Sequence, residues 1–461
     1  MIRLPFVALF VAAATATAAP AATPSPEVLR DAALDDGIAW DIVEGLTTEV
    51  GQRLAGTEAE ARARDWAVKK LKALGFANVH VETYTMPVWR RGIETAEIIS
   101  PYPQKLAVTA LGNSVPTPAQ GLTAEVVGFD GMEALKAADP SSIRGKIVFV
   151  NHAMAVQQDG GSYGEVGVIR RLGPSVAAAK GAAAIVIRSI GTDRHRMPHT
   201  GVQTWAAGVQ PIPAAALSVS DAEQMARILA QGKPVKLHLT IGAGPAGTAQ
   251  SGNVVAEVPG RDPKAGILLV GGHLDSWDVG TGAIDDGAGV AITAAAAKRI
   301  MDAGRPLRTI RVVWFGAEEV GGLGGDAYAK AHAGEKHVLV GESDSGADRV
   351  WRFTTSSGSP QSPLIGRLSS LLAPLGITRG KDPAHGGTDV APAAAATRSP
   401  VIDLRQDASR YFDVHHTADD TLDRIDKDQL RQNVAAWTAT LAFFANDPAE
   451  LAPTTGAAHT E

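Results

Sequence analysis

The stretch GILLVGGHLDSWDVGTGAIDDGAG, residues 266–289, indicates the fold class of this chain. It opens on a continuous apolar run, residues 266–270, which is typical of a strand covered on both faces. Residues 287–300 are rich in alanine and predict a helix that stops at Gly304. Further strands are predicted at residues 309–315, 337–340 and 400–404, and a closing helix at residues 429–444. This alternation predicts an α/β fold with a mostly parallel mixed sheet and helices on both faces.

Outward from this stretch, the chain divides into a main domain and an insert. Residues 26–74 have helical spacing, and residues 79–89 alternate like a strand. Residues 122–239 carry an α/β pattern of their own between Gly/Pro-rich boundaries, which predicts an inserted domain. The predicted division is a signal peptide (1–19), a linker (20–26), the main domain's first part (27–118), the insert (119–243), the main domain's second part (244–450) and a flexible tail (451–461).

Composition and the N-terminal segment limit the class of protein. Of the 461 residues 45% are hydrophobic, and a net charge of -6 gives no basic surface for nucleic acid or an anionic membrane. Arg3, the apolar residues 6–14 and Ala16-Thr17-Ala18 predict a cleaved signal peptide, hence a secreted or periplasmic protein without a membrane anchor. The chain has no cysteine, so any metal site must use His, Asp and Glu.

Histidine and acidic residues follow three of the predicted strands directly. His273 follows the first strand, Glu318-Glu319 the second and Asp344 the third. Ligands bind outside the carboxyl ends of parallel strands, so we expect these side chains to meet at one edge of the sheet. The Glu pair comes straight after an apolar strand, where a cleft should open.

Each of these groups also has a plainer explanation. Asp285-Asp286 would cap the helix that begins at Gly287, and a lone histidine after a strand is more often a loop residue than a ligand. In the insert, His195 and His199 are interpreted as part of a surface loop. A functional site is nevertheless favoured, because without one every one of these plainer explanations would have to be true at the same time.

The ordered motifs resemble those of the co-catalytic zinc exopeptidases, which include secreted aminopeptidases and glutamate carboxypeptidases. The resemblance is strongest to the plasma glutamate carboxypeptidase group, and the insert resembles a protease-associated domain. It implies the zinc exopeptidase fold. The motifs are HLDSWD (273–278), GAIDDG (282–287), Glu318-Glu319, ESD (342–344) and HHTADDT (415–421).

Position by position, the resemblance implies two Zn²⁺ ions per chain. Asp285 would bridge them, His273 and Asp344 would complete one site, and Glu319 and His416 the other. The family pattern His-Ser/Thr-x-x-Asp-Thr selects His416 over its neighbour.

The same resemblance implies two supporting catalytic roles. Glu318 would be the general base that takes a proton from the attacking water and passes it to the leaving amine. Asp275 would fix the ring of the metal-binding His273, as such imidazoles usually require.

The substrate is the less determined part of the hypothesis. Unblocked dipeptides or short peptides are expected, and an insert that roofs the cleft would limit substrate length. One alternative is an aminopeptidase with an open cleft that acts on longer chains, in which the insert serves stability or contacts in a homodimer. The other alternative is a non-catalytic binding protein on the same fold. Asp389 and Arg405 are candidate substrate contacts: Asp389 is expected to face the pocket, and Arg405 could grip a terminal carboxylate.

Overall fold

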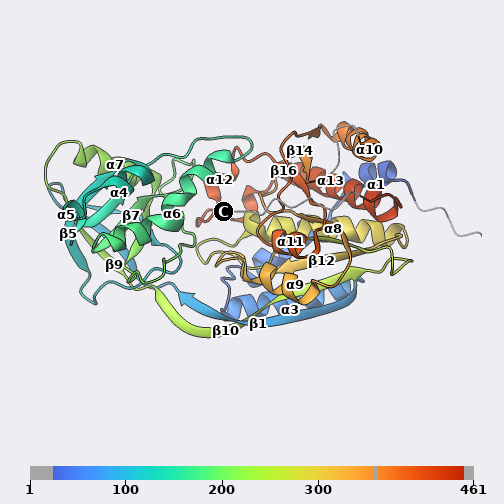
Figure 1. Ribbon diagram of the computed structural model, residues 1–461, viewed down its shortest axis with the longest axis horizontal. Helices are drawn as coiled ribbons and strands as arrows, with labels where there is room; N and C mark the ends of the chain where they lie inside the picture. Colours follow the sequence, from blue (N-terminus) through green and yellow to red (C-terminus); the bar gives the residue numbers. More distant parts are fainter. Residues whose placement is uncertain (1–23, 357–361, 451–461) are drawn as a thin grey trace, which may run out of the picture.

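The computed structural model describes residues 24–356 and 362–450 and has two lobes joined by two long strands (Figure 1). The predicted signal peptide, most of the linker and the predicted tail lie outside the described residues. In the part of the chain that is described, no helix has the length and apolar character needed to cross a membrane.

The main lobe is built on a five-stranded mixed sheet in the order β1-β10-β12-β11-β13. β11, β12 and β13 are parallel, whereas β10 and β1 form an antiparallel pair at one edge. His273 is paired with Phe315 in the register, so β11 and β12 end together at one edge. The bounds are β1 (Ala77–Arg90), β10 (Gly244–Val258), β11 (Ile267–His273), β12 (Thr309–Phe315) and β13 (His337–Glu342).

Helices cover both faces of this sheet, which confirms the predicted α/β class. Neighbouring strand residues point to opposite faces, so Leu268 and Val270 pack in one core, with α8 and α13, while Leu269 packs in the other, with α9 and α11. Both faces are therefore apolar, which explains the continuous run in the sequence. The helices are α1 (Pro26–Ala33), α2 (Ile38–Gly45), α3 (Glu58–Ala73), α8 (Ala288–Ala303), α9 (Leu323–His332), α11 (Ala391–Thr397) and α13 (Lys427–Asn446).

One predicted strand of the central sheet belongs elsewhere. β16 (Ile402–Gln406) is the third strand of a small sheet, where it runs antiparallel to β14 (Val350–Thr355), and β15 (Thr378–Arg379) completes that sheet. Among the described residues, one isolated bridge, between Val340 of β13 and Val401 just before β16, links it to the central sheet. The prediction of a fourth central strand was wrong because apolar character identifies a strand but not its pairing partner. α10 (Pro363–Leu372) precedes β15.

The second lobe contains an eight-stranded sheet in the order β3-β2-β9-β5-β6-β7-β8-β4. Its strands are β2 (Glu94–Ser100), β3 (Gln104–Leu106), β4 (Val108–Ala110), β5 (Leu122–Phe129), β6 (Ile147–Val150), β7 (Ala184–Arg188), β8 (Ala214–Leu217) and β9 (Lys236–Ile241). Its helices are α4 (Gly131–Ala137), α5 (Pro140–Ile143), α6 (Gly161–Ala179) and α7 (Val219–Leu229).

The insert starts earlier than the sequence boundary at residue 119. β2 pairs with β9 and β4 pairs with β8, so the segment from β2 to β4 belongs to the insert rather than to the main domain. At the junction between the lobes, the outgoing and returning backbone segments lie close together at Gly92 and Gly242. A Cβ on Gly92 would lie only 2.5 Å from the carbonyl oxygen of Gly242, so this position requires glycine. The boundary was misplaced because these pairings join strands more than 100 residues apart.

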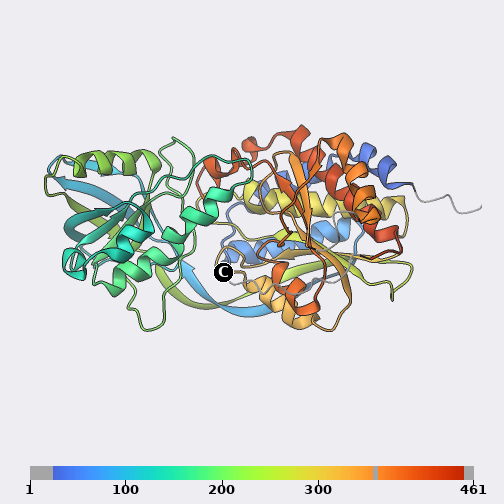
Figure 2. The same ribbon diagram turned by 45° about the horizontal axis from the view of Figure 1, so that its top comes forward.

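The two lobes touch again near the predicted site. α6 of the insert reaches α12 (Tyr411–Val414) of the main lobe, as Figures 1 and 2 show. The ring of Tyr163 stacks on Phe412 with centroids 4.8 Å apart. Ala408 and Phe412 are part of a hydrophobic core that otherwise consists of insert residues, apart from a half-buried Tyr411 packed against it.

Candidate metal centre

The carboxyl ends of the parallel strands bring the first group of predicted ligands together. His273 is the last residue of β11, and Asp344 follows β13 by two residues. The ring atom Nε2 of His273 lies 3.0 Å from Oδ1 of Asp285 and 3.6 Å from Oδ1 of Asp344. All three side chains therefore face one small space.

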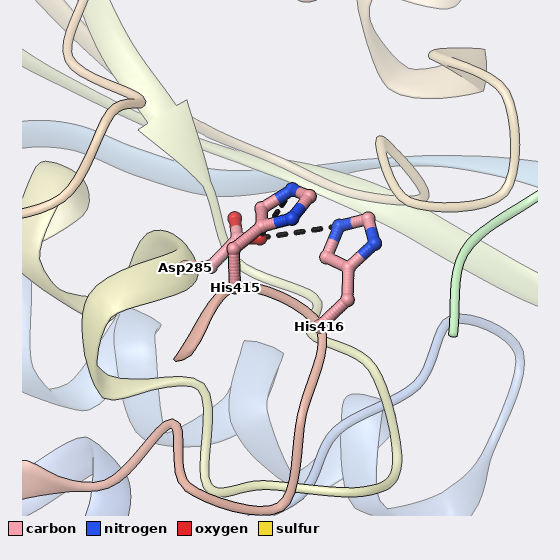
Figure 3. A group of neighbouring side chains, drawn as sticks. All are labelled: Asp285, His415 and His416. Atoms are coloured by element: carbon pink, nitrogen blue, oxygen red, sulfur yellow. Dashed lines mark ion pairs between the residues drawn. The ribbon is translucent and has the colours of Figure 1, made fainter. Parts of the chain in front are cut away.

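The second group lies on the other side of the Asp285 carboxylate. Nε2 of His416 lies 2.9 Å from Oε2 of Glu319 and 3.2 Å from Oδ2 of Asp285. Oδ1 of Asp285 thus faces His273, and Oδ2 faces His416. Figure 3 shows both His415 and His416 directed at this carboxylate, and Nε2 of His415 is 3.6 Å from Oδ2.

The donor set fits divalent cations. Among the described residues, buried oxygens of Asp285, Glu319 and Asp344 lack a hydrogen-bond partner, which is costly unless another ligand satisfies them. Burial, and then the charge of Asp344, raises the pKa of Glu318 well above its usual value, against the opposing effect of His273. Imidazole and carboxylate donors without thiols suit a catalytic zinc site.

The two neighbouring aspartates have different partners. Asp286 caps α8, since its Oδ1 accepts a hydrogen bond from the backbone N–H of Gly289 at 3.1 Å. The helix-capping explanation therefore holds for Oδ1 of Asp286, while its Oδ2 accepts from the backbone N–H of His273 at 3.0 Å and Asp286 lies in one potential ligand group with His273 and Asp344. Asp285 faces the histidines. The Asp285 backbone is fixed by Asp420, whose carboxylate accepts from the N–H groups of Ile284 and Asp285 at 2.6 and 3.2 Å.

Asp275 supports the site differently from the expectation. Nδ1 of His273 contacts the backbone carbonyl oxygen of Asp275 at 2.9 Å, whereas the nearest carboxylate oxygen is 3.7 Å away. The carboxylate instead accepts from the backbone N–H groups of Glu318 and Glu319, at 3.1 and 3.3 Å. These two donors follow the end of β12 by three and four residues, and Asp275 is the acceptor that satisfies them.

Arg53 is a supporting residue that the sequence did not reveal. Its side chain is fully buried and donates to the carbonyl oxygens of Leu274, Thr281 and Gly282. These bonds close the loop between His273 and Asp285. No local pattern marks Arg53, which lies more than 200 residues before the loop that it holds.

The two candidate substrate contacts lie in different surroundings. Arg405 lines a cavity of about 240 Å³ together with Glu342, Asp344 and, from the insert, Asp159. Asp389 is fully buried, and its backbone N–H donates to Glu342 at 3.0 Å. Burial, and then the charge of Glu342, raises its pKa well above the usual value. Both carboxylate oxygens of Asp389 lack a hydrogen-bond partner among the described residues, and its role as a substrate contact stays a prediction.

Comparison with known proteins places the chain in a family. Residues 253–441 match the family model described as Peptidase family M28. Carboxypeptidase Q from Bos taurus is 36% identical over 417 residues, which cover 88% of this chain and 85% of that protein. The chain belongs to peptidase family M28. Carboxypeptidase Q from Homo sapiens has the same identity and coverage.

Solved structures extend the likeness to the whole architecture. A peptidase M28 precursor from Shewanella amazonensis is 47% identical, with a TM-score of 0.91 over 94% of this chain and 98% of that one. An aminopeptidase from Aneurinibacillus, 21% identical with a TM-score of 0.63 over 93% and 98%, shares the fold. The resemblance predicted from the motifs is confirmed, as are the fold and the expectation of an enzyme, a metallo-exopeptidase of family M28.

Proposed function

We propose that this M28 peptidase is an exported di-zinc dipeptidase that cuts unblocked dipeptides or short peptides. The observation that carries the proposal is the position of Asp285, with one carboxylate oxygen facing His273 and the other facing His416. A carboxylate shared in this way matches the bridge that a two-metal site needs. Export rests on the signal peptide predicted for residues 1–19.

His273, Asp285 and Asp344 would hold one zinc ion, and Asp285, Glu319 and His416 the other. Zinc is proposed because the donors are imidazole and carboxylate groups, and because one similar fold is that of a zinc aminopeptidase from Bacillus subtilis. Bound zinc supplies Lewis acidity, which polarises a peptide carbonyl and makes a water acidic.

Glu318 is proposed as the general base. Its neighbour Glu319 belongs to a group of potential metal ligands among the described residues, whereas Glu318 belongs to none. Its carboxylate therefore remains free to take a proton from the attacking water and give it to the leaving amine. Asp275 would hold the backbone of both glutamates in place.

The insert is proposed to limit substrate length. Asp159 forms part of the wall of the cavity that Asp344 and Arg405 line. The insert is held there by the N–H of Ala408, which donates to the carbonyl of Gln158 at 2.9 Å, and by Gln158 Nε2, which donates to Asp407 at 2.8 Å. A cavity that the insert closes at Asp159 would hold a small ligand but would not admit a peptide chain that extends beyond this wall.

Extension of the substrate tests this wall. When a dipeptide is lengthened by one and two residues at its C-terminus, we expect kcat/KM to fall by at least about 10²-fold, because a misplaced scissile bond costs that much. Steady-state kinetics on the matched series measures it. Equal rates on dipeptides and octapeptides would instead identify an open-cleft aminopeptidase, while zinc binding without any turnover would leave the binding-protein alternative.

Arg405 is proposed to bind the terminal carboxylate. Its nearest carboxylate, Asp403, is 3.9 Å away, so the guanidinium is not held by a tight ion pair. Arg405→Ala should lower kcat/KM for dipeptides by about 10- to 100-fold, the value of a charge-assisted hydrogen bond. The same dipeptides with an amidated C-terminus should be insensitive to this change.

Arg410→Ala is the matched control. Arg410 is already bound to Asp348, with Nε 2.9 Å from Oδ2, so its removal should leave the preference for a free carboxylate unchanged. If Arg405→Ala slowed the amides as much as the acids, Arg405 would not be the carboxylate anchor.

A further inference from the structure

The turn that carries His415 and His416 is held by the other lobe. The backbone N–H of Thr200, in the insert, donates to the carbonyl oxygen of His416 at 3.0 Å. The carbonyl oxygen of Thr200 lies 3.3 Å from Nδ1 of His416. The φ angle of His416 is 61°, a left-handed conformation that a residue with a side chain keeps only when its surroundings enforce it.

A buried pair in the insert holds the neighbouring residue. Nδ1 of His199 lies 2.7 Å from the carbonyl oxygen of His415, and Nε2 lies 2.6 Å from Oδ2 of Asp193. Both side chains are at most 1% exposed, so His199 is not part of the surface loop expected from the sequence. A Cβ on Gly191 would lie 2.2 Å from the imidazole, so only a glycine leaves room for the ring.

Hydrogen-bond chemistry defines what this pair does. A backbone carbonyl and a carboxylate both only accept, so both ring nitrogens of His199 donate, Nδ1 to the carbonyl oxygen of His415 and Nε2 to Asp193. By the same reasoning Nδ1 of His416 donates to Thr200, which leaves its Nε2 free to bind a metal. Arg170 lies 3.4 Å from the same Nδ1 but offers only donors, so Thr200 supplies the acceptor.

We propose that Asp193 and His199 are positioning residues through which the insert sets the geometry of the His416 ligand. This inference rests on the proposed di-zinc function and adds to it a dependence of one metal site on the insert. The site formed by Glu319 and His416 reaches full affinity only when the turn is held by the insert. The site formed by His273 and Asp344 lies at the ends of β11 and β13 of the main sheet and does not depend on the insert.

The test measures zinc affinity at each site rather than activity alone. Zinc-free protein is titrated in competition with a chromophoric chelator, and Co²⁺-loaded protein identifies the affected site by its visible spectrum. His199→Leu should weaken one of the two sites by about 10- to 100-fold, as loss of a ligand's support does. The altered cobalt band should be the one altered by Glu319→Gln and not the one altered by Asp344→Asn.

Two further variants separate positioning from folding. Asp193→Asn keeps the imidazole but removes the charge, so a smaller loss at the same site is expected. His152→Ala changes a half-exposed histidine of the insert whose partner, Asp130, also lies in the insert, and should leave both affinities at wild-type values. If His199→Leu did not fold by circular dichroism, Asp193→Asn would decide the matter by the same measurement.

The possible outcomes distinguish the two proposals. Wild-type affinity at both sites in the folded His199 and Asp193 variants would overturn the positioning role and leave the di-zinc function standing. Equal weakening of both sites would also overturn it, because the effect would then be general. A wild-type protein that bound no zinc would overturn both proposals.

Discussion

Replacement of Glu318 by glutamine is expected to lower kcat by about 10²–10⁴-fold, the usual contribution of a positioned general base. Glutamine keeps the size of the side chain but cannot accept the proton from the attacking water. Zinc content should stay at two ions per chain, because Glu318 belongs to none of the groups of potential ligands found among the described residues. Steady-state kinetics together with elemental analysis of the same preparation measures both quantities.

Glu319→Gln is the matched control for this result. The two glutamates are adjacent and both have their backbone N–H bound by Asp275, yet only Glu319 faces His416 at 2.9 Å. Glu319→Gln should therefore release one zinc ion, with loss of activity as a consequence. If both variants lost metal and activity to the same extent, the distinction between base and ligand would be wrong.

Removal of zinc is expected to abolish hydrolysis completely, and zinc should restore it. The reaction as proposed has no nucleophilic side chain, so the protein alone cannot replace the Lewis acidity of the ions. Because Asp285 faces both histidine groups, activity should return fully only as the second equivalent of zinc is added. Dialysis against a chelator, followed by titration with zinc and an assay at each step, measures this.

Zinc should also stabilise the folded protein. A ligand that binds only the folded state raises the free energy of unfolding by about 2.7 kcal/mol when its free concentration is 100 times its Kd. The stabilisation is expected because zinc would bind the buried oxygens of Asp285, Glu319 and Asp344, which lack hydrogen-bond partners among the described residues. Metal-free protein should therefore melt at a lower temperature. Full turnover by such protein, with less than one zinc ion per ten chains, would refute the proposed function.

The sequence alone predicted the three parallel strands β11, β12 and β13 of the central sheet and the residues that follow them directly. Parallel strands end at a common edge, so an apolar run followed directly by His273 or Glu318 identifies both the strand and the position of its last residues. The structure places His273 beside Asp285 and Asp344 at this edge. The prediction of these strands succeeded because each signal is local: a run of strand residues and the residues next to it.

Tertiary structure decided the features that join distant parts of the chain. The pairing of β2 with β9 moved the start of the insert, and β16 pairs with β14 rather than with the central sheet. Arg53 holds a loop more than 200 residues away, and His199 does the same for the turn at His415. These contacts are a few hydrogen bonds or strand pairings between segments far apart in sequence. They leave no periodicity or spacing in the sequence, because their geometry exists only once both segments are packed.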